Sequence, residues 1–337
     1  MFSGLVVGIL FGFLLQRGQF CFVSGFRNLL WQKNFAFLSA LFIAITLQSI
    51  GLFTLDELQL ITIPITQLPL LATLLGGFIF GFGMVVANCC ATGSWFRSAE
   101  GKLSSVIVLI TFMLTMAAGQ TGVLKDSLNQ FLQSPLELDN FYLTLGISPW
   151  YLVGVLICIT CFLCYYSATH QSNKSSSSSS TLLHWRLFST HLPLWFTAIL
   201  IGILGVIAWW LSAQTGRNYG FGIAVPSANI LQYIVTGQQR YLNWGSCFVL
   251  GILIGSFISA KSSGEFNWRP LSGYDFIRRV IGGFLMGIGA TLAGGCTVTN
   301  ALVATAYFSW QGWLAMIMMI LGCWSATYFF KPTQSQH

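Results

Sequence analysis

The chain has 337 residues, of which 55% are hydrophobic and only 7% are charged, and its mean hydropathy is +0.74. Soluble globular domains carry about 25% charged residues, so this composition excludes a soluble protein. The net charge of +7 is spread thinly between apolar runs, which fits the loops of a polytopic membrane protein better than nucleic-acid binding.

Apolar runs that are long enough to cross a bilayer recur along the chain. A helix needs about 20 apolar residues to span the hydrocarbon core. The clearest runs are residues 35–53, 103–124, 150–168, 192–211, 244–260 and 310–330. Tryptophans at run ends, such as Trp31 and Trp150, suit the membrane interface. The sequence therefore predicts an all-α, polytopic membrane protein.

A polar segment, THQSNKSSSSSSTLLHWRLFSTH, interrupts this pattern at residues 169–191. Its serine tract is typical of a flexible, solvated linker. We therefore expect a first half at residues 1–168, the linker at 169–191, a second half at 192–330 and a C-terminal tail at 331–337.

The two halves contain related sequences. GGFIFGFGMVVANCC, from Gly76, aligns without a gap with GGFLMGIGATLAGGC, from Gly282, at a constant offset of 206 residues. A weaker match pairs residues 8–22 with 202–221 and sets Cys21 opposite Gly220. Repeated halves of this kind are typical of transporters with inverted repeats and discontinuous helices. We expect two inverted repeat halves whose re-entrant or broken helices meet at a central pore.

The two matches define four equivalent positions at the ends of apolar runs, which we call corners. Cysteines occupy three of them and Gly220 the fourth. The repeat selects Cys90 and Cys296 independently, and Cys21 follows the related run near the N-terminus. A buried cysteine often serves only as a small apolar residue, so packing is the alternative interpretation for all three. Cys89 aligns with Gly295, which favours a small-residue role.

Other chemistry is poorly supported. The run CITCFLC, from Cys158 to Cys164, lies inside an apolar segment without a fourth ligand, so packing is favoured there. All four histidines fall in the linker or tail, away from the corners. We expect no metal, no cofactor and, without a catalytic triad or paired carboxylates, no enzyme activity.

Two arginines stand close to the corner cysteines. Arg17 precedes Cys21 and Arg97 follows Cys90 by seven residues. Either could attract an anion, although charges at helix ends often only set topology or snorkel to headgroups. We expect Arg97 to pair with Glu100 on one helical face and to lie at a pore mouth.

Basic loops predict the orientation of the chain. By the positive-inside rule, the loops with Arg27 and Lys33, with Lys174 and Arg186, and with Lys261 and Arg269 are expected in the cytoplasm. Residues 56–57 and 126–139 should then face outward. Arg278 and Arg279 are expected only to set topology.

The motifs RGQFCF, ANCCATGSWFRSAEGK and LAGGCTV together resemble the YeeE/YedE family of sulfur-compound permeases. The resemblance covers nearly the whole chain, with three motifs in the same order. It implies an hourglass-shaped bundle in the bacterial inner membrane, which takes up thiosulfate or a related sulfur anion. It also implies that Cys21, Cys90 and Cys296 pass the anion along.

The resemblance implies a further partner, a small cytoplasmic sulfur-carrier protein, which is sometimes fused to such permeases but is not part of this chain. Two departures touch the pore. Asn88 and Cys89 stand where the family often has two glycines, and Thr299 and Asn300 stand where Gly–His is frequent.

Two alternatives remain open. The first is transport of another sulfur or selenium species, such as sulfide or selenite. The second is a membrane thiol oxidoreductase, which would need a cysteine pair close enough to cross-link and a quinone or partner site. The expected partners are thus the sulfur anion, the lipid bilayer and the carrier protein, with no nucleic acid.

Overall fold

The structure is a computed structural model that describes residues 1–330 except 66, 134, 137, 173–191 and 272. Within these residues the regular secondary structure is helical, with isolated β-bridges and no β-strand. Eight helical stretches are long and apolar enough to cross a membrane. The prediction of an all-α polytopic membrane protein is confirmed.

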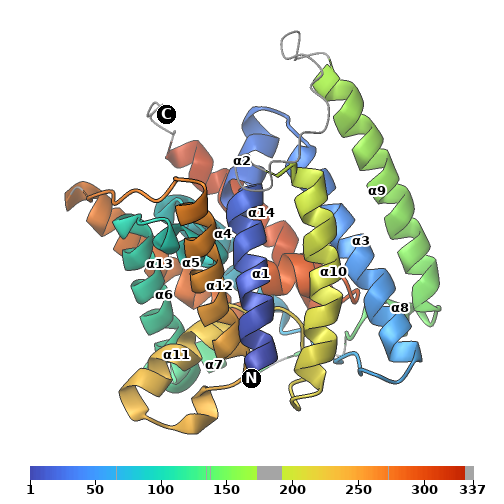
Figure 1. The fold of residues 1–337 in the computed structure, drawn as a ribbon. Helices are drawn as coiled ribbons and strands as arrows, with labels where there is room; N and C mark the ends of the chain where they lie inside the picture. The colour runs from blue at the N-terminus through green and yellow to red at the C-terminus, as the bar shows by residue number, and fades with distance from the viewer. Residues whose placement is uncertain (66, 134, 137, 173–191, 272, 331–337) are drawn as a thin grey trace.

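The helices follow one another along the described residues (Figure 1). They are α1 (Phe2–Gly18), α2 (Phe22–Trp31), α3 (Ala36–Glu57), α4 (Leu70–Ala87), α5 (Ala91–Ala99), α6 (Leu103–Thr121), α7 (Lys125–Asn129), α8 (Phe141–Leu145), α9 (Pro149–Ser172), α10 (Leu194–Ala213), α11 (Ala224–Thr236), η1 (Gln239–Tyr241), α12 (Trp244–Ser262), α13 (Gly273–Leu292), η2 (Thr299–Ala304) and α14 (Trp310–Phe329). The predicted apolar runs correspond to α3, α6, α9, α10, α12 and α14. Two further spans, residues 2–31 and 70–99, each contain an interruption.

Helix breaks occur at all four predicted corners. They separate α1 from α2, α4 from α5, α10 from α11, and α13 from η2. A residue with positive φ lies in each break: Gln19 (45°), Asn88 (55°), Gly216 (80°) and Gly294 (72°). Left-handed backbone ends a helix, and glycine and asparagine tolerate it best. Asn88 can therefore replace the family's glycine without preventing the break.

Helices of the two halves pack against one another. Gly4 lies close to Trp244, and Gly12 lies close to Ile252. Because the residue numbers rise together along the two helices, α1 and α12 are parallel. Three more pairs of contacting helices are parallel: α3 and α10, α4 and α14, and α6 and α13. The helices α4 and α13 are antiparallel. When each helix is replaced by its counterpart in the other half, the pair of α1 and α12 becomes that of α10 and α3, and the pair of α4 and α14 becomes that of α13 and α6. The pair of α4 and α13 maps onto itself.

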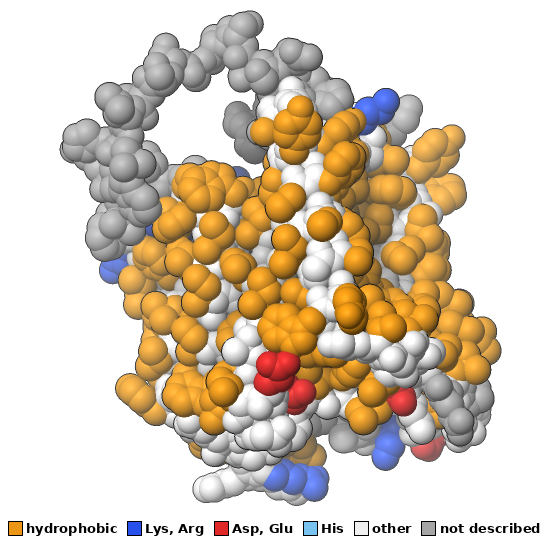
Figure 2. Space-filling view, turned by 90° about the vertical axis from the view of Figure 1, so that its right-hand side faces the viewer, with side chains coloured by type: hydrophobic (Ala, Val, Ile, Leu, Met, Phe, Trp, Pro, Cys, Tyr) orange, Lys and Arg blue, Asp and Glu red, His pale blue; other side chains and the backbone are white. Residues whose placement is uncertain are grey.

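The helix α9 stands at the edge of the bundle against α3 (Figure 1). It continues to Ser172, beyond the expected boundary at residue 168. The expected linker from residue 173 onward and the tail at 331–337 lie outside the described residues. Figure 2 shows a broad apolar surface on this side of the bundle, with charged side chains mainly toward its two ends. This distribution suits a protein surrounded by lipid.

Basic side chains gather at the end of the bundle where α1, α4 and α12 finish. Arg17 of α1 contacts Ser262 of α12, and the loop after α12 pairs with the turn before α6 through Lys102 and Arg269. This end holds α2 and the loop after it, the end of α12 and the loop after it, the start of α13 and the turn before α6. These segments carry the basic residues Arg27, Lys33, Lys102, Lys261, Arg269, Arg278 and Arg279. We refer to this end of the bundle as the basic end. The end of α3 and the helix α7 lie at the opposite end, and they carry the acidic residues Asp56, Glu57 and Asp126.

Candidate functional site

The three corner cysteines lie beside the helix breaks and are all buried. Cys21 is the N-cap residue of α2, Cys90 is the N-cap residue of α5, and Cys296 lies between α13 and η2. Their exposed fractions are 4%, 1% and 0%. All three belong to the cluster of buried side chains that forms the core of the bundle, and Arg97 of α5 contacts Cys21. The fold thus brings three positions that are far apart in the sequence into one buried region.

Each of these sulfur atoms has a polar neighbour. The backbone N–H of Gly93 donates a hydrogen bond to Cys90 Sγ at 3.3 Å. Cys296 Sγ lies 3.7 Å from Thr299 Oγ1. The first turns of α2 and α5 point their positive helix ends toward Cys21 and Cys90. A purely apolar packing role would not require these contacts.

Arg97 joins two of the breaks. Its side chain turns back from α5, so that Nη1 donates to the Asn88 carbonyl at 2.8 Å and Nη2 to Cys21 Sγ at 3.5 Å. Among the described residues, Arg97 forms no ion pair with Glu100, because Glu100 pairs with Lys102 at 2.7 Å instead. The expected Arg97–Glu100 pair is therefore wrong. The guanidinium contacts the Cys21 thiol directly. The expected place of Arg97 at a pore mouth stays a prediction.

Arg17 has different surroundings. It is only 2% exposed, its Nη2 donates to Ser262 Oγ at 3.1 Å, and its guanidinium lies 5.7 Å from the centre of the Phe13 ring. These contacts hold the end of α1 against α12. Anion attraction by Arg17 stays a prediction.

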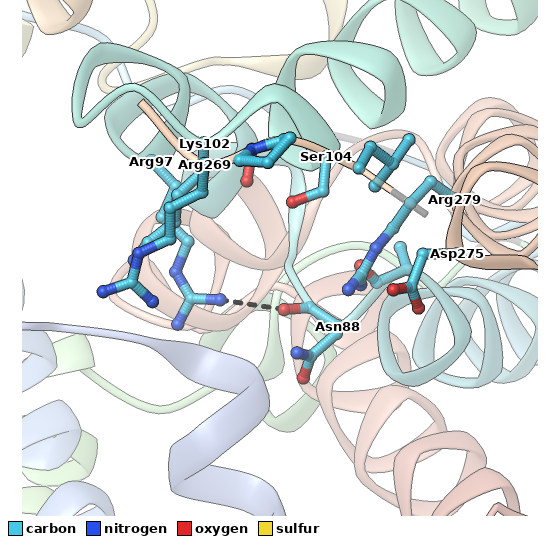
Figure 3. Close-up of a pocket in the computed structure, with 11 residues that line it drawn as sticks. Asn88, Arg97, Lys102, Ser104, Arg269, Asp275 and Arg279 are labelled. Atoms are coloured by element: carbon cyan, nitrogen blue, oxygen red, sulfur yellow. Dashed lines mark hydrogen bonds between the residues drawn. The ribbon is translucent and has the colours of Figure 1, made fainter. Parts of the chain in front are cut away.

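A pocket of about 550 Å³ opens beside Arg97 at the basic end (Figure 3). Its lining residues, which we call the basic pocket, are Ala87, Asn88, Arg97, Lys102, Ser104, Ser105, Arg269, Pro270, Leu271, Asp275 and Arg279. Figure 3 shows Arg97, Lys102 and Arg269 on one side, Arg279 and Asp275 on the other, and Ser104 between them.

Sequence reasoning missed most of this pocket. Lys102 and Arg279 flank corner segments, and that position was a usable signal, but Arg279 was assigned to topology alone. Arg269 carries no local signal. It reaches the pocket because its backbone N–H donates to the Gly101 carbonyl at 3.2 Å, which ties the loop after α12 to the turn before α6.

Side chains satisfy the carbonyl groups that the breaks leave free. Arg279 donates through Nη1 to the Ala87 carbonyl at the end of α4. At the end of α13, Asn300 Nδ2 donates to the carbonyls of Ala293 at 3.1 Å and Gly295 at 3.0 Å. Asn300, which stands near the position of the family's histidine, thus stabilises the break between α13 and η2.

The fourth corner cannot hold a thiol in this conformation. Gly220 is buried, and a Cβ atom there would lie 2.8 Å from Trp209 Cε3. Arg217 Nη1 donates to the carbonyls of Tyr219 at 3.1 Å and Gly220 at 3.0 Å. This corner therefore contributes backbone and an arginine instead of a sulfur atom.

The remaining cysteines differ in position. Cys89 is buried and lies within electrostatic range of Arg97 and Arg279, so a fourth thiol accompanies the corner set. On α9, Cys158 and Cys161 are exposed at the edge of the bundle. In the part of the chain that the structure describes, no group of three His, Cys, Asp or Glu residues is arranged to hold a metal ion.

Comparison with known proteins gives consistent matches. The family model for sulphur transport matches residues 17–325. The thiosulfate transporter TsuA of Escherichia coli (strain K12) is 43% identical over 333 residues, which cover 97% of this chain and 93% of that protein. The thiosulfate transporter TsuA of Spirochaeta thermophila is 33% identical, with 97% and 98% covered. A probable transporter, YedE, of Salmonella typhimurium is 34% identical over 100 residues, or 29% of this chain and 24% of that protein. On this ground the chain belongs to the sulphur-transport family of membrane permeases.

Proposed function

We propose that this protein is a permease, not an enzyme, that takes up thiosulfate across the bacterial inner membrane. The observation that carries the proposal is the burial of Cys21, Cys90 and Cys296 beside helix breaks, with Arg97 in contact with the first of them. The names of the two long relatives, both thiosulfate transporters, support the same substrate.

The chemistry of the thiols suits this anion. Thiosulfate is a dianion whose terminal sulfur is soft and carries part of the charge. A neutral thiol is a weak S–H donor, so it can contact that sulfur without holding it tightly. Conduction requires sites that bind an ion well enough to admit it and weakly enough to release it. Because Cys90 Sγ accepts the Gly93 N–H, its own hydrogen is not used in that bond.

The architecture completes the proposal. The two halves form an inverted repeat about an axis in the membrane plane, as the antiparallel pair α4 and α13 suggests. The basic end faces the cytoplasm, in line with the positive-inside rule. Thiosulfate then enters at the opposite end, passes the thiols and leaves at the basic end. The family resemblance alone adds a small sulfur-carrier protein as a cytoplasmic partner.

Uptake of labelled thiosulfate by cells that depend on this protein tests the proposal. Serine at Cys21, Cys90 or Cys296 should lower uptake about tenfold or more while the protein remains in the membrane. The matched control is Cys161→Ser on α9, which is exposed at the edge of the bundle and should be silent. Normal transport by Cys90→Ser would refute the thiol path.

Competition identifies the substrate. Excess unlabelled thiosulfate should suppress uptake of the label, whereas sulfate should compete poorly, because its hard oxygens gain little from thiol donors. Stronger competition by sulfide or selenite than by thiosulfate would favour the other transport hypothesis. Thiosulfate-dependent reduction of a quinone by the purified protein, without uptake, would favour the oxidoreductase.

A further inference from the structure

We propose that the basic pocket binds a small divalent oxyanion through its oxygen atoms, at a site separate from the three thiols. The inference rests on the proposed function for the identity of the physiological ligand, which is thiosulfate held by its sulfonate oxygens. Sulfate presents the same oxygens and serves as a probe of the pocket.

The charge of the pocket matches a dianion. Three guanidinium groups line it, those of Arg97, Arg269 and Arg279, and Asp275 offsets one of them. Lys102 also lines the pocket but already pairs with Glu100. An excess of two positive charges remains. A concave site with charges of one sign raises the local concentration of the opposite ion.

Hydrogen bonds to backbone carbonyls hold two of these guanidinium groups in fixed positions. Figure 3 shows Arg97 and Arg279 approaching Asn88 from opposite sides of the pocket. Each is fixed by a backbone carbonyl, of Asn88 and of Ala87 respectively. The Nε atoms of both arginines are buried without a hydrogen-bond partner among the described residues. Fixed guanidinium groups lose little freedom when an oxyanion binds, and planar donors suit such a ligand.

Neutral donors complete the site. The 19-residue helix α6 begins at Leu103, and Ser104 and Ser105 of its first turn line the pocket. The Ser104 side chain lies between the two groups of basic residues (Figure 3). The start of a helix presents backbone N–H groups and a positive dipole end to an anion. In this pocket they add to the guanidinium donors and do not act alone.

The position of the pocket gives it a role in transport. Arg97 lines it and also contacts Cys21 Sγ, so a bound anion lies next to the thiol region. The pocket recognises charge and oxygen atoms, whereas the thiols recognise the soft sulfur. Sulfate therefore binds in the pocket without being carried, and thiosulfate is held there before it leaves the protein.

Equilibrium binding of labelled sulfate and labelled thiosulfate to the full chain in nanodiscs of neutral phosphatidylcholine tests the site. Both anions should bind at low salt, and chloride should compete weakly. Arg269→Gln and Ser104→Ala should each raise the Kd about threefold to fivefold, the size expected for one exposed contact. Arg240→Gln, an exposed arginine at the other end, is the matched control and should leave the Kd unchanged. Arg279→Gln is avoided because it also removes the bond to Ala87.

Three results would overturn the inference. Sulfate binding that neither pocket variant weakens would place the anion elsewhere. Binding of thiosulfate without sulfate would assign the site to the thiols. Displacement of sulfate when phosphatidylglycerol replaces part of the neutral lipid would make the pocket a headgroup site. Cys90→Ser should keep sulfate binding and lose uptake; if it keeps both, the thiol path fails and the pocket stands.

Discussion

The breaks after α4 and after α13 come from the same sequence repeat, yet they are stabilised by different chemistry. Asn88 and Gly294 occupy equivalent positions and both have positive φ. The preceding residues, Ala87 and Ala293, are also equivalent. The Ala87 carbonyl accepts from a guanidinium, that of Arg279, whereas the Ala293 carbonyl accepts from side-chain amides, among them Asn300 at 3.1 Å.

The difference shows that a repeat can preserve backbone geometry and still place charge on one side only. A helix that ends inside a membrane protein leaves carbonyl groups that need donors, and charged or neutral donors both meet this need. Where Arg97 stands in the first repeat, the same offset gives Val303 in the second. The break near Cys90 therefore has charged donors, whereas the break at Cys296 has neutral ones.

The largest effect is expected from Asn300→Asp, which gives the neutral break a charge of the wrong sign. The carboxylate cannot donate, and it would face the carbonyls of Ala293 and Gly295 in a buried place. We expect a loss of about 3–5 kcal/mol in stability, measured as a lower melting temperature of the purified protein. Asn88→Asp is the matched control, because its side chain is exposed. Equal melting temperatures for the two variants would show that the Asn300 amide is not needed at this break.

Arg97→Gln removes a charge from the other break. The variant lacks the guanidinium and therefore its contacts with Asn88 and Cys21. The KM for thiosulfate uptake should rise about tenfold or more. Arg97→Lys should rescue poorly, since one ammonium cannot reproduce the forked geometry. Added salt should reduce the advantage of the wild type only in part, because the group is half-buried. Full rescue by lysine would mean that only the charge matters.

Exchanging the left-handed residues should have a smaller and unequal effect. Gly294→Asn keeps a tolerated backbone conformation, but the new Cβ would collide with the Gln311 amide, which caps Ala293. We expect a loss of about 1–2 kcal/mol in stability. The reciprocal change, Asn88→Gly, should cost less than about 1 kcal/mol, because glycine adopts the same conformation freely. Melting temperatures in the reverse order would mean that the Gln311 amide moves aside at little cost and that the Asn88 side chain is needed at its own break.

The smallest effect is expected from Thr299→Val beside Cys296. The contact of 3.7 Å between Thr299 Oγ1 and Cys296 Sγ is long, and valine keeps the shape of threonine. Uptake should change by less than about fivefold, since a weak neutral hydrogen bond contributes about 1 kcal/mol or less. A tenfold loss would indicate that the hydroxyl contacts the anion directly, as we propose for Arg97 near the break after α4.

The sequence by itself determined the membrane class, six of the eight candidate spans and the places where the repeated helices end. These features depend on local properties: the length of an apolar run, a residue that tolerates positive φ, and an ungapped repeat that selects Cys90 and Cys296. The break after α10 was harder to locate, because its match to the first corner contains an insertion and its corner residue is Gly220, without a side chain to notice.

Only the tertiary structure decided what surrounds the thiols. Arg97 turns back to Cys21, which is 76 positions away, and Arg279 reaches Ala87 across 192 positions. Arg269 joins them through a backbone bond to Gly101. Such contacts leave no periodic trace in the sequence, because they depend on how separate helix breaks pack together. The same charges could otherwise have served topology alone, as the sequence suggested for Arg279.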